Sequence, residues 1–418
     1  MFDKICKCIK DTWIYCTFGL MLFLPRTISI SKYIFVGISL ISASMFLIFK
    51  FKNIKIDKKI LFWFVISLIV NLIWILIGIF YGNSLDGLND EFRLNFIWAI
   101  IYFVFVLSLS NSKLCLKLFD VMIYINFVIA IYTIMIYIDS KYNLGLTFLY
   151  GLDSQARIGL HDGYSQITSH NLGTMLFTTP FIMGIFFNRT DKIKLIINIL
   201  ISFIAIVVSG RRALLLSIIL SIFLIFILNI IEVKLNFRKG KRYIFIFLIS
   251  LIFFLMGIKI LDQLKIIDIN VMVTRINESL AIDNSNIRII QIKALLEGYL
   301  NYPFFGSGFA KGVSSVVRSE ESPWLYEVTY FSKLYNMGLI GFIFFIFILI
   351  FNFFIGIQVV KKFKANAYYM KGLLAGYLSF LIMCFTNPYL SSFDFMWILY
   401  IIPMYYNYIF IKENVNEK

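Results

Sequence analysis

The chain has 418 residues, of which 60% are hydrophobic and only 15% are charged. A soluble domain needs roughly a quarter charged residues to cover its surface, so this composition excludes a soluble globular protein and indicates a membrane protein. The formal net charge of +16 does not indicate nucleic-acid binding, because basic residues accumulate at the cytoplasmic ends of membrane helices.

Long apolar runs predict the membrane spans, since one span needs about 20 mostly apolar residues. In chain order the expected spans are residues 12–25, 33–49, 60–80, 95–110, 116–138, 169–187, 193–208, 211–231, 243–260, 333–358, 367–386 and 393–411. These runs predict an all-α polytopic membrane protein of about 12 transmembrane helices, with eleven or thirteen as the alternatives, in one domain over residues 1–418. Unbroken runs of this length are not the short alternating segments of a β-barrel. The N-terminus carries lysines but no small-residue cleavage site, so we expect its first span to be a retained anchor.

Basic residues give the orientation of the spans. With the N-terminus in the cytoplasm, 24 of the 39 Lys and Arg residues fall in cytoplasmic segments, and six of the other 15 lie in one long loop where the rule has little force. Both termini are therefore predicted to be cytoplasmic. Residues 139–168 form a smaller outer loop, and residues 261–332 form a large one.

Cysteine positions bear on disulfides and metals. None of the five cysteines falls in an outer loop, which argues against a disulfide framework. Cys6 and Cys8 have no nearby histidine, so they make a poor zinc site, and we expect no metal or other cofactor.

The large outer loop contains a predicted amphipathic helix over residues 287–300. Ile289, Ile292, Leu296 and Tyr299 follow helical spacing, and Pro303 ends the helix. The turn over residues 304–308 then carries two glycines, which permit close backbone approaches. A loop that only caps the membrane helices is the competing interpretation.

Two adjacent arginines, Arg211 and Arg212, lie between two apolar runs. Charge beside hydrocarbon is costly unless it reaches the interface or meets an anion. A helix that starts at Ala213 would aim its free N–H groups at the same place, which suits a phosphate. Simple anchoring at the interface is the alternative.

Glu327 stands among aromatic residues just before a span, which suits a partly desolvated general base. Its structural alternative is an ion pair with Lys333 or Arg318. A further polar stretch over residues 150–175 holds Arg157 and the only two histidines, His161 and His170. Their spacing does not suit a metal, so contact with a polar substrate and a solvated loop remain as alternatives.

Three features together resemble the bacterial O-antigen polymerase and ligase superfamily. They are Ser209-Gly210-Arg211-Arg212-Ala213-Leu214-Leu215 at the outer start of a span, the Arg288 helix running into Pro303-Phe304-Phe305-Gly306-Ser307-Gly308-Phe309, and Gly338-Leu339-Ile340-Gly341. The resemblance implies a GT-C-like membrane glycosyltransferase. It would act without metal on undecaprenyl-diphosphate-linked sugars at the periplasmic face of the bacterial inner membrane, in lipopolysaccharide or other surface polysaccharide biosynthesis.

The resemblance also implies roles for residues. Arg211 and Arg288 would hold the diphosphate and Glu327 would activate the acceptor hydroxyl. Expected substrate contacts are Arg212, Arg157, His161, His170, Tyr330 and Arg318.

One departure from the family bears on the reaction. Ligases place a histidine eleven residues before the first glycine of the third feature, and this chain has Glu327 there. The departure favours a polymerase that joins repeat units. The alternatives are a ligase to lipid A core, or a flippase or transporter for the same lipid-linked oligosaccharide. Expected partners are the lipid-linked glycans, membrane lipids and a candidate chain-length regulator, with no nucleic acid.

Overall fold

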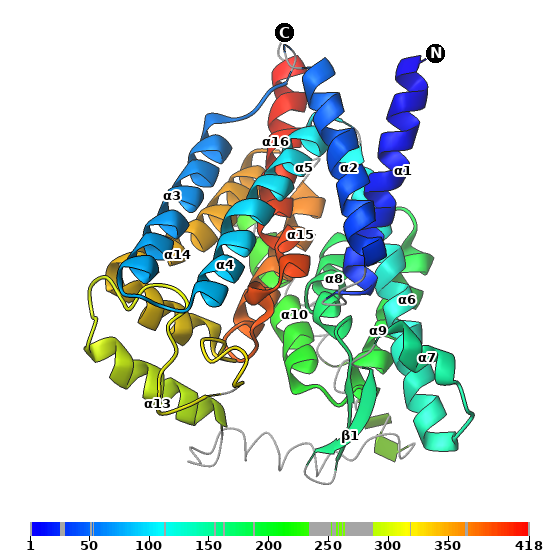
Figure 1. Ribbon diagram of the computed structural model, residues 1–418. Coiled ribbons are helices and arrows are strands. Elements are labelled where there is room, and N and C mark those ends of the chain that lie inside the picture. The colour runs from blue at the N-terminus through cyan, green and yellow to red at the C-terminus, as the bar shows by residue number, and fades with distance from the viewer. Residues whose placement is uncertain are drawn as a thin grey trace. The chain divides into compact units, whose positions relative to one another are not determined.

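The computed structural model describes residues 2–25, 30–50, 52, 54–112, 114–153, 156–161, 164–186, 189–233, 287–317, 319–363 and 367–416, with a few helical residues between 252 and 263. Nearly all of the regular structure in these residues is helical (Figure 1). The one sheet among them is a two-stranded hairpin. The chain is therefore an all-α membrane protein, as its composition predicted.

The chain packs as two compact units, each built from separated segments. The first unit holds residues 1–42, 113–277 and 356–380. Its elements are α1 (Phe2–Phe23), the first part of α2 (Ile30–Phe49), α6 (Leu114–Tyr142), α7 (Thr147–Leu152), β1 (Arg157–His161), β2 (Tyr164–Thr168), α8 (Leu172–Ile185), α9 (Lys192–Val208), α10 (Arg212–Val233), the end of α14 and most of α15 (Ala367–Met383). In this unit α6 packs against α1, α8 and α9, and α8 packs against α10.

The second unit holds residues 43–112, 278–355 and 381–418. Its elements are the end of α2, α3 (Lys58–Phe80), α4 (Leu85–Phe92), the π-helical turn η2 (Arg93–Trp98), α5 (Ala99–Ser110), α13 (Ile287–Leu300), most of α14 (Thr329–Lys362), the end of α15, the 3₁₀ turns η5 (Tyr389–Ser391) and η6 (Phe393–Phe395), and α16 (Trp397–Asn416). Here α16 packs along α5, and α3 contacts α4.

Six of the described helices are long and apolar enough to cross a membrane. They are Ile30–Phe49, Lys58–Phe80, Leu85–Ser110, Leu114–Tyr142, Arg212–Ile231 and Thr329–Lys362. Shorter apolar helices run over Thr12–Phe23, Leu172–Ile185 and Ala367–Met383. The span expected at 243–260 falls largely outside the described residues. A total of twelve spans stays a prediction.

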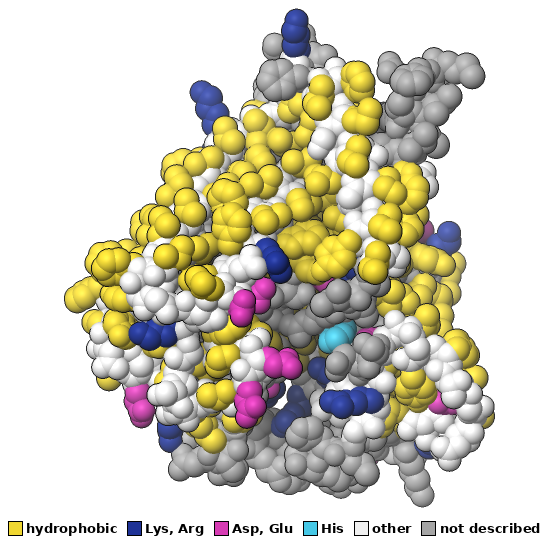
Figure 2. Space-filling view, in the orientation of Figure 1, with side chains coloured by type: hydrophobic (Ala, Val, Ile, Leu, Met, Phe, Trp, Pro, Cys, Tyr) yellow, Lys and Arg dark blue, Asp and Glu magenta, His cyan; other side chains and the backbone are white. Residues whose placement is uncertain are grey.

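Large apolar side chains stand exposed on several of these helices, as expected of surfaces that face lipid. On α3, Phe62 is 56% exposed, Leu76 is 55% exposed and Phe80 is 86% exposed. Figure 2 shows hydrophobic side chains covering the visible face of α3. The exposed apolar surface supports a lipid environment for this helix.

Inside the first unit a network of polar side chains links three helices. Asn126 of α6 donates to Asn198 and to Ser202 of α9, at 2.8 Å each. Its carbonyl oxygen accepts the hydroxyls of Thr178 and Thr179 of α8, at 2.6 and 3.1 Å. All five side chains are buried, and each hydrogen bond joins two of these helices.

Two of the expected spans belong to longer helical segments that begin earlier than predicted and are interrupted along their length. The one expected at 95–110 follows α4, which starts at Leu85, and the π-helical turn η2 joins α4 to α5. The one expected at 333–358 starts at Thr329 as α14, and its helix is broken at Gly338. The prediction from apolar runs missed both starts because the first turns of these helices contain polar residues.

One end of the second unit brings together two segments that are predicted to be cytoplasmic and the end of the last predicted span. The backbone N–H of Asp57, at the start of α3, donates to Asn407 of α16 at 2.9 Å. Asn407 also donates to the carbonyl of Lys55 at 3.1 Å, and the backbone N–H of Lys55 donates to Asn111 at 3.0 Å. Two segments that were assigned to the cytoplasmic side by charge thus lie beside the cytoplasmic end of the last predicted span in this unit.

Candidate functional site

The glycine-bearing turn over residues 304–308 fits against the break in α14. Backbone N–H groups of Ser307 and Gly308 donate to the carbonyls of Tyr335 and Asn336, at 3.1 and 2.9 Å. In return, Leu339 donates to the carbonyl of Pro303 at 2.8 Å. A broken helix leaves backbone groups without partners, and the turn satisfies them here.

Three glycines make this contact possible. Gly306, Gly308 and Gly338 have φ angles of +74°, +75° and +62°, which larger residues rarely adopt. A Cβ atom on Gly306 would overlap the backbone of Asn336 and Gly338, and one on Gly308 would overlap Gly78 of α3. The predicted close approach at the turn glycines is confirmed, and Gly338 adds a third position.

Helix α13 has the predicted bounds but turns a different face inward. Gln291, Ala294 and Leu295 are its buried residues, whereas Leu296, which was expected on the apolar stripe, is 39% exposed. The buried face is shifted by about one residue, which corresponds to about 100° around the helix. The spacing of apolar residues missed this because the buried face includes the polar Gln291.

Arg288 and Glu327 form an ion pair between α13 and the segment before α14. Arg288 Nε donates to Glu327 Oε2 at 2.9 Å, with side chains 39% and 22% exposed. The backbone N–H of Glu327 donates to Gln291 Oε1 at 2.9 Å. Arg288 and Gln291 are three residues apart and therefore share one face of α13. This helix holds Glu327 by both its side chain and its backbone.

The alternative pairing of Glu327 with Lys333 is not what the structure shows. Lys333 Nζ instead lies 3.1 Å from Glu91 Oε2 of α4 and 4.3 Å from the centre of the Phe309 ring. Arg318 lies outside the described residues. Tyr330 is buried, and its hydroxyl donates to the carbonyl of Leu381 at 2.8 Å.

In the first unit, Arg211 is tied to the hairpin. Its Nε donates to the carbonyl of Ile167 at 3.0 Å, and the backbone N–H of Ile167 donates to the carbonyl of Ser209 at 3.0 Å. Gly210, at φ +65°, forms the corner between them. Among the described residues the Arg211 guanidinium has no other partner, so its two terminal amino groups remain for an anion. Arg212 follows as the exposed first residue of α10.

The hairpin itself was not expected from the sequence, which suggested an irregular loop. Arg157 is paired with Thr168 across the two antiparallel strands, and the Thr168 hydroxyl donates to the carbonyl of Arg157 at 3.0 Å. The Arg157 side chain is exposed. His161 is the last residue of β1, and its side chain lies outside the described part of the chain.

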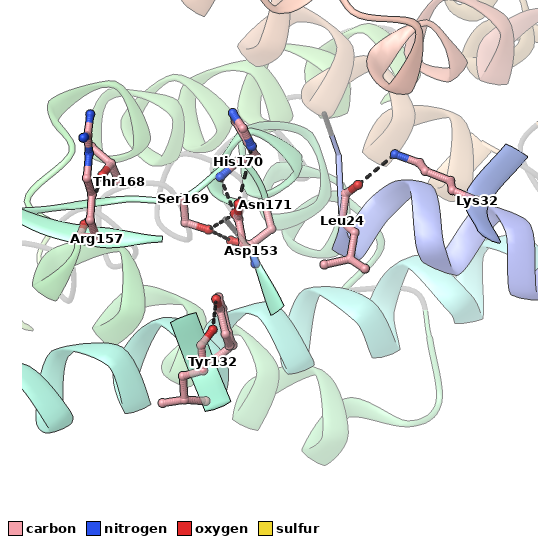
Figure 3. Close-up of polar contacts among 10 residues, drawn as sticks. Leu24, Lys32, Tyr132, Asp153, Arg157, Thr168, Ser169, His170 and Asn171 are labelled. Carbon is pink, nitrogen blue, oxygen red and sulfur yellow. Dashed lines mark hydrogen bonds and ion pairs between the residues drawn. The ribbon is translucent and has the colours of Figure 1, made fainter. Parts of the chain in front are cut away.

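Directly after β2, a buried carboxylate organises the start of α8 (Figure 3). Asp153 is 1% exposed and accepts the Ser169 hydroxyl at 2.9 Å and the His170 backbone N–H at 2.8 Å. His170 Nδ1 lies 3.5 Å from the other oxygen of Asp153. Ser169 also lies 2.6 Å from Asn171 Oδ1. We call Asp153, Ser169, His170 and Asn171 the Asp153 corner.

Each unit thus brings part of the predicted site together. The second unit joins Arg288 to Glu327, and the first places Arg211, Arg157 and His170 on or beside one hairpin. The sequence did not predict the contact of Gln291 with Glu327 or the contacts of Asp153 with Ser169 and His170. These partners come together only in the folded chain. Within the part of the chain that the structure describes, no three His, Cys, Asp or Glu side chains gather as a metal ion requires.

Residues 197–346 match a protein family described as O-antigen ligase. The matched segment includes Arg211, Arg288, Glu327 and the glycine-bearing turn, and it covers less than half of the chain. No curated protein matches this chain. The family match supports the O-antigen ligase and polymerase superfamily, whose members are membrane enzymes of the glycosyltransferase type acting on lipid-linked glycans.

Proposed function

We propose that this protein is a polysaccharide polymerase that joins undecaprenyl-diphosphate-linked repeat units at the periplasmic face of the bacterial inner membrane. The family match supports a ligase or polymerase reaction in general. The single observation that carries the proposal further is the Arg288–Glu327 pair within the matched segment. It joins an anion-binding group to a proton acceptor.

The protein must assist this reaction in two ways. The acceptor hydroxyl attacks the first carbon of the donor sugar, a new carbon–oxygen bond forms, and the bond to the diphosphate breaks with its electron pair going to the diphosphate. A carboxylate can take the hydroxyl proton late in this step, and positive charge can stabilise the departing diphosphate. Glu327 and Arg288 are our candidates for these two roles.

Their contact couples the two roles. In the structure Glu327 neutralises part of the charge on Arg288, and the Nε bond uses one of the five donors of the guanidinium. When Glu327 accepts a proton, it becomes neutral and its attraction for Arg288 weakens. Arg288 then presents its full charge to the diphosphate at the moment that charge develops there.

Arg211 is our candidate for diphosphate binding in the first unit. Its Nε bond to Ile167 fixes the guanidinium plane, and its terminal amino groups, which no described residue contacts, can bind two phosphate oxygens. A lysine at this place would offer a point charge without that two-donor grip. Arg157 and His170 are proposed substrate contacts on the same hairpin and helix start.

Glu327 also favours polymerase over ligase within the proposal. It stands where the ligases that the sequence resembles carry a histidine, so the ligase acceptor chemistry is not reproduced. A ligase remains the alternative, and its acceptor would be lipid A core. In a deletion strain, single repeat units retained on the core without a ladder of longer chains would indicate a polymerase, and loss of all units from the core would indicate a ligase.

The direct test is Glu327→Gln in the purified protein. Glutamine accepts a hydrogen bond from Arg288 but cannot take a proton, so we expect lipid-linked glycan to bind and kcat to fall by about 10² to 10⁴. Glu297→Gln on the exposed side of α13 removes the same charge and is the matched control. Wild-type rates for Glu327→Gln, normalised to folded protein, would remove Glu327 from the mechanism.

The arginines are tested in the same assay. Arg288→Ala and Arg211→Ala should each lower kcat by about 10² to 10³, and lysine should restore little of it. Arg93→Ala, which removes an exposed arginine paired with Asp90 on a neighbouring turn, is the control. A normal ladder of long chains in a strain carrying Arg288→Ala would show that α13 is only structural.

A further inference from the structure

The Asp153 corner contains a polar atom that no described residue satisfies. Asn171 is 0% exposed, and its amide nitrogen has no hydrogen-bond partner in the described part of the chain. The Ser169 hydroxyl has a single proton, which it can give to Asp153 or to Asn171. Whether Asp153 or Asn171 accepts this proton, and in either orientation of the amide, one amide atom of Asn171 has no partner among the described residues. Such a buried group is costly unless a ligand or water meets it.

His170 is oriented by the same carboxylate. Its Nδ1 is buried and lies 3.5 Å from Asp153 Oδ1, while the side chain as a whole is 24% exposed. The exposed part is therefore the opposite edge of the ring, which carries Nε2. Because Nδ1 faces a carboxylate, the ring proton of the neutral imidazole belongs on Nδ1, and Nε2 is left as a hydrogen-bond acceptor.

The chemistry of the corner selects its ligand. A sugar hydroxyl can donate to Nε2 and can either donate to or accept from the Asn171 amide. A phosphate oxygen only accepts, so it cannot pair with the Nε2 of a neutral ring, and it would also approach the buried carboxylate of Asp153. The corner therefore fits hydroxyl groups, whereas the neighbouring guanidinium of Arg211 fits phosphate.

The corner and Arg211 are close along one stretch of backbone. Arg211 holds the carbonyl of Ile167, and His170 is three residues further on. Successive Cα atoms are about 3.8 Å apart, so the Cα atoms of residues 167 and 170 are at most about 11 Å apart. In Figure 3 the side chains of Arg157 and His170 project to the same side. One sugar attached to a diphosphate can span such a distance.

We propose that the Asp153 corner binds hydroxyl groups of the sugar that is attached to the diphosphate, through His170 Nε2 and the Asn171 amide, with Asp153 as a positioning residue. This inference rests on the proposed function and specifies which part of the substrate the first unit binds. It predicts that the corner contributes to binding of glycan-bearing lipid and not to binding of the bare lipid diphosphate.

The test compares two probes on the purified full-length protein. One is undecaprenyl diphosphate, which has no sugar, and the other is the lipid-linked oligosaccharide extracted from cells that lack this protein. His170→Phe keeps a ring of similar size without the acceptor. It should raise the Kd for the oligosaccharide lipid by about 5- to 10-fold, as expected for the loss of a hydrogen bond, and leave the Kd for undecaprenyl diphosphate unchanged.

The second variant in this binding test is Asp153→Asn. An amide facing Nδ1 no longer fixes the tautomer, so this variant should lose the same selectivity. Asp153 acts through His170 and, by way of Ser169, through Asn171, so any loss that the double variant shows beyond His170→Phe alone measures its hold on Asn171. Tyr124→Phe, which removes a hydroxyl from an exposed position on α6, should change neither Kd.

The outcomes separate this inference from the proposed function. If the wild-type protein binds neither probe, the proposed function fails. If Arg211→Ala weakens both probes and His170→Phe weakens neither, only the sugar assignment fails. Should His170→Phe weaken both probes equally, His170→Gln decides: a glutamine oxygen that restores the glycan preference supports the assignment, and no restoration overturns it.

Discussion

Replacing Gly338 by alanine should disrupt the break in α14. Gly338 has φ +62° and ψ −174°, a backbone conformation that is essentially reserved for glycine. A Cβ atom there would also overlap the backbone of Phe304 and Gly306 in the turn. The substitution therefore forces either the helix break or the turn to move.

The expected cost follows from these two effects. Forcing a non-glycine residue into this conformation costs about 1–3 kcal/mol, and overpacking against backbone costs about another 1–3 kcal/mol. The sum is a large fraction of the 5–15 kcal/mol that stabilises a typical domain. We expect the apparent Tm of the purified protein to fall by at least about 3 °C.

Gly37→Ala is the matched control for this measurement. Gly37 lies inside α2, and a Cβ atom there meets nothing within 4 Å. Alanine is the better helix former by about 1 kcal/mol, so Tm should stay the same or rise slightly. The two variants are compared by thermal unfolding in one detergent. A wild-type Tm for Gly338→Ala would refute the close packing of the turn against α14.

Two further predictions concern orientation and acid sensitivity. From the distribution of basic residues, an impermeant thiol reagent on intact spheroplasts should label Asp283→Cys and not Lys239→Cys in a cysteine-free background; the reverse pattern would overturn the topology. Burial alone would raise the pKa of Asp191, but hydrogen bonds from Arg189 outweigh it and hold that pKa below its ordinary value. The pair therefore contributes stability above the ordinary pKa of about 3.9 and loses it as the pH falls through the lower folded value, so Arg189→Gln should lower Tm at pH 7 and make little difference in strong acid. An equal Tm difference at both pH values would contradict this.

The sequence predicted well where one local pattern decides the structure. Apolar runs located most of the described helices, and the spacing around Ile292 with Pro303 gave the bounds of α13. The hydrogen-bond and ion-pair partners of polar side chains, in contrast, are residues that lie far away in the sequence, so no local pattern identifies them. Gln291 was missed because it looks like a polar interruption until its contact with Glu327 is seen. The alternative of a Glu327–Lys333 pair was wrong because Lys333 pairs with Glu91, which lies 242 residues away in the sequence. The hairpin was missed because its strands are short and because Ile167 of β2 is held by Ser209 and Arg211, which lie far from it in the sequence.

The buried network around Asn126 has a consequence for how the first unit is assembled. An asparagine side chain within a span is unfavourable in lipid until it forms hydrogen bonds. We therefore expect α6 to reach its final register only when α8 and α9 pack against it. Once they do, Thr178 and Thr179 fix the rotation of α8, because a slip of one residue would turn both hydroxyls by about 100° away from Asn126. The same rotation decides where the first residues of α8 point. His170 lies two residues before this helix, so the polar contact within the hydrophobic layer acts together with Asp153 in placing its imidazole. A helix inserted one residue out of step would bury or misdirect that ring.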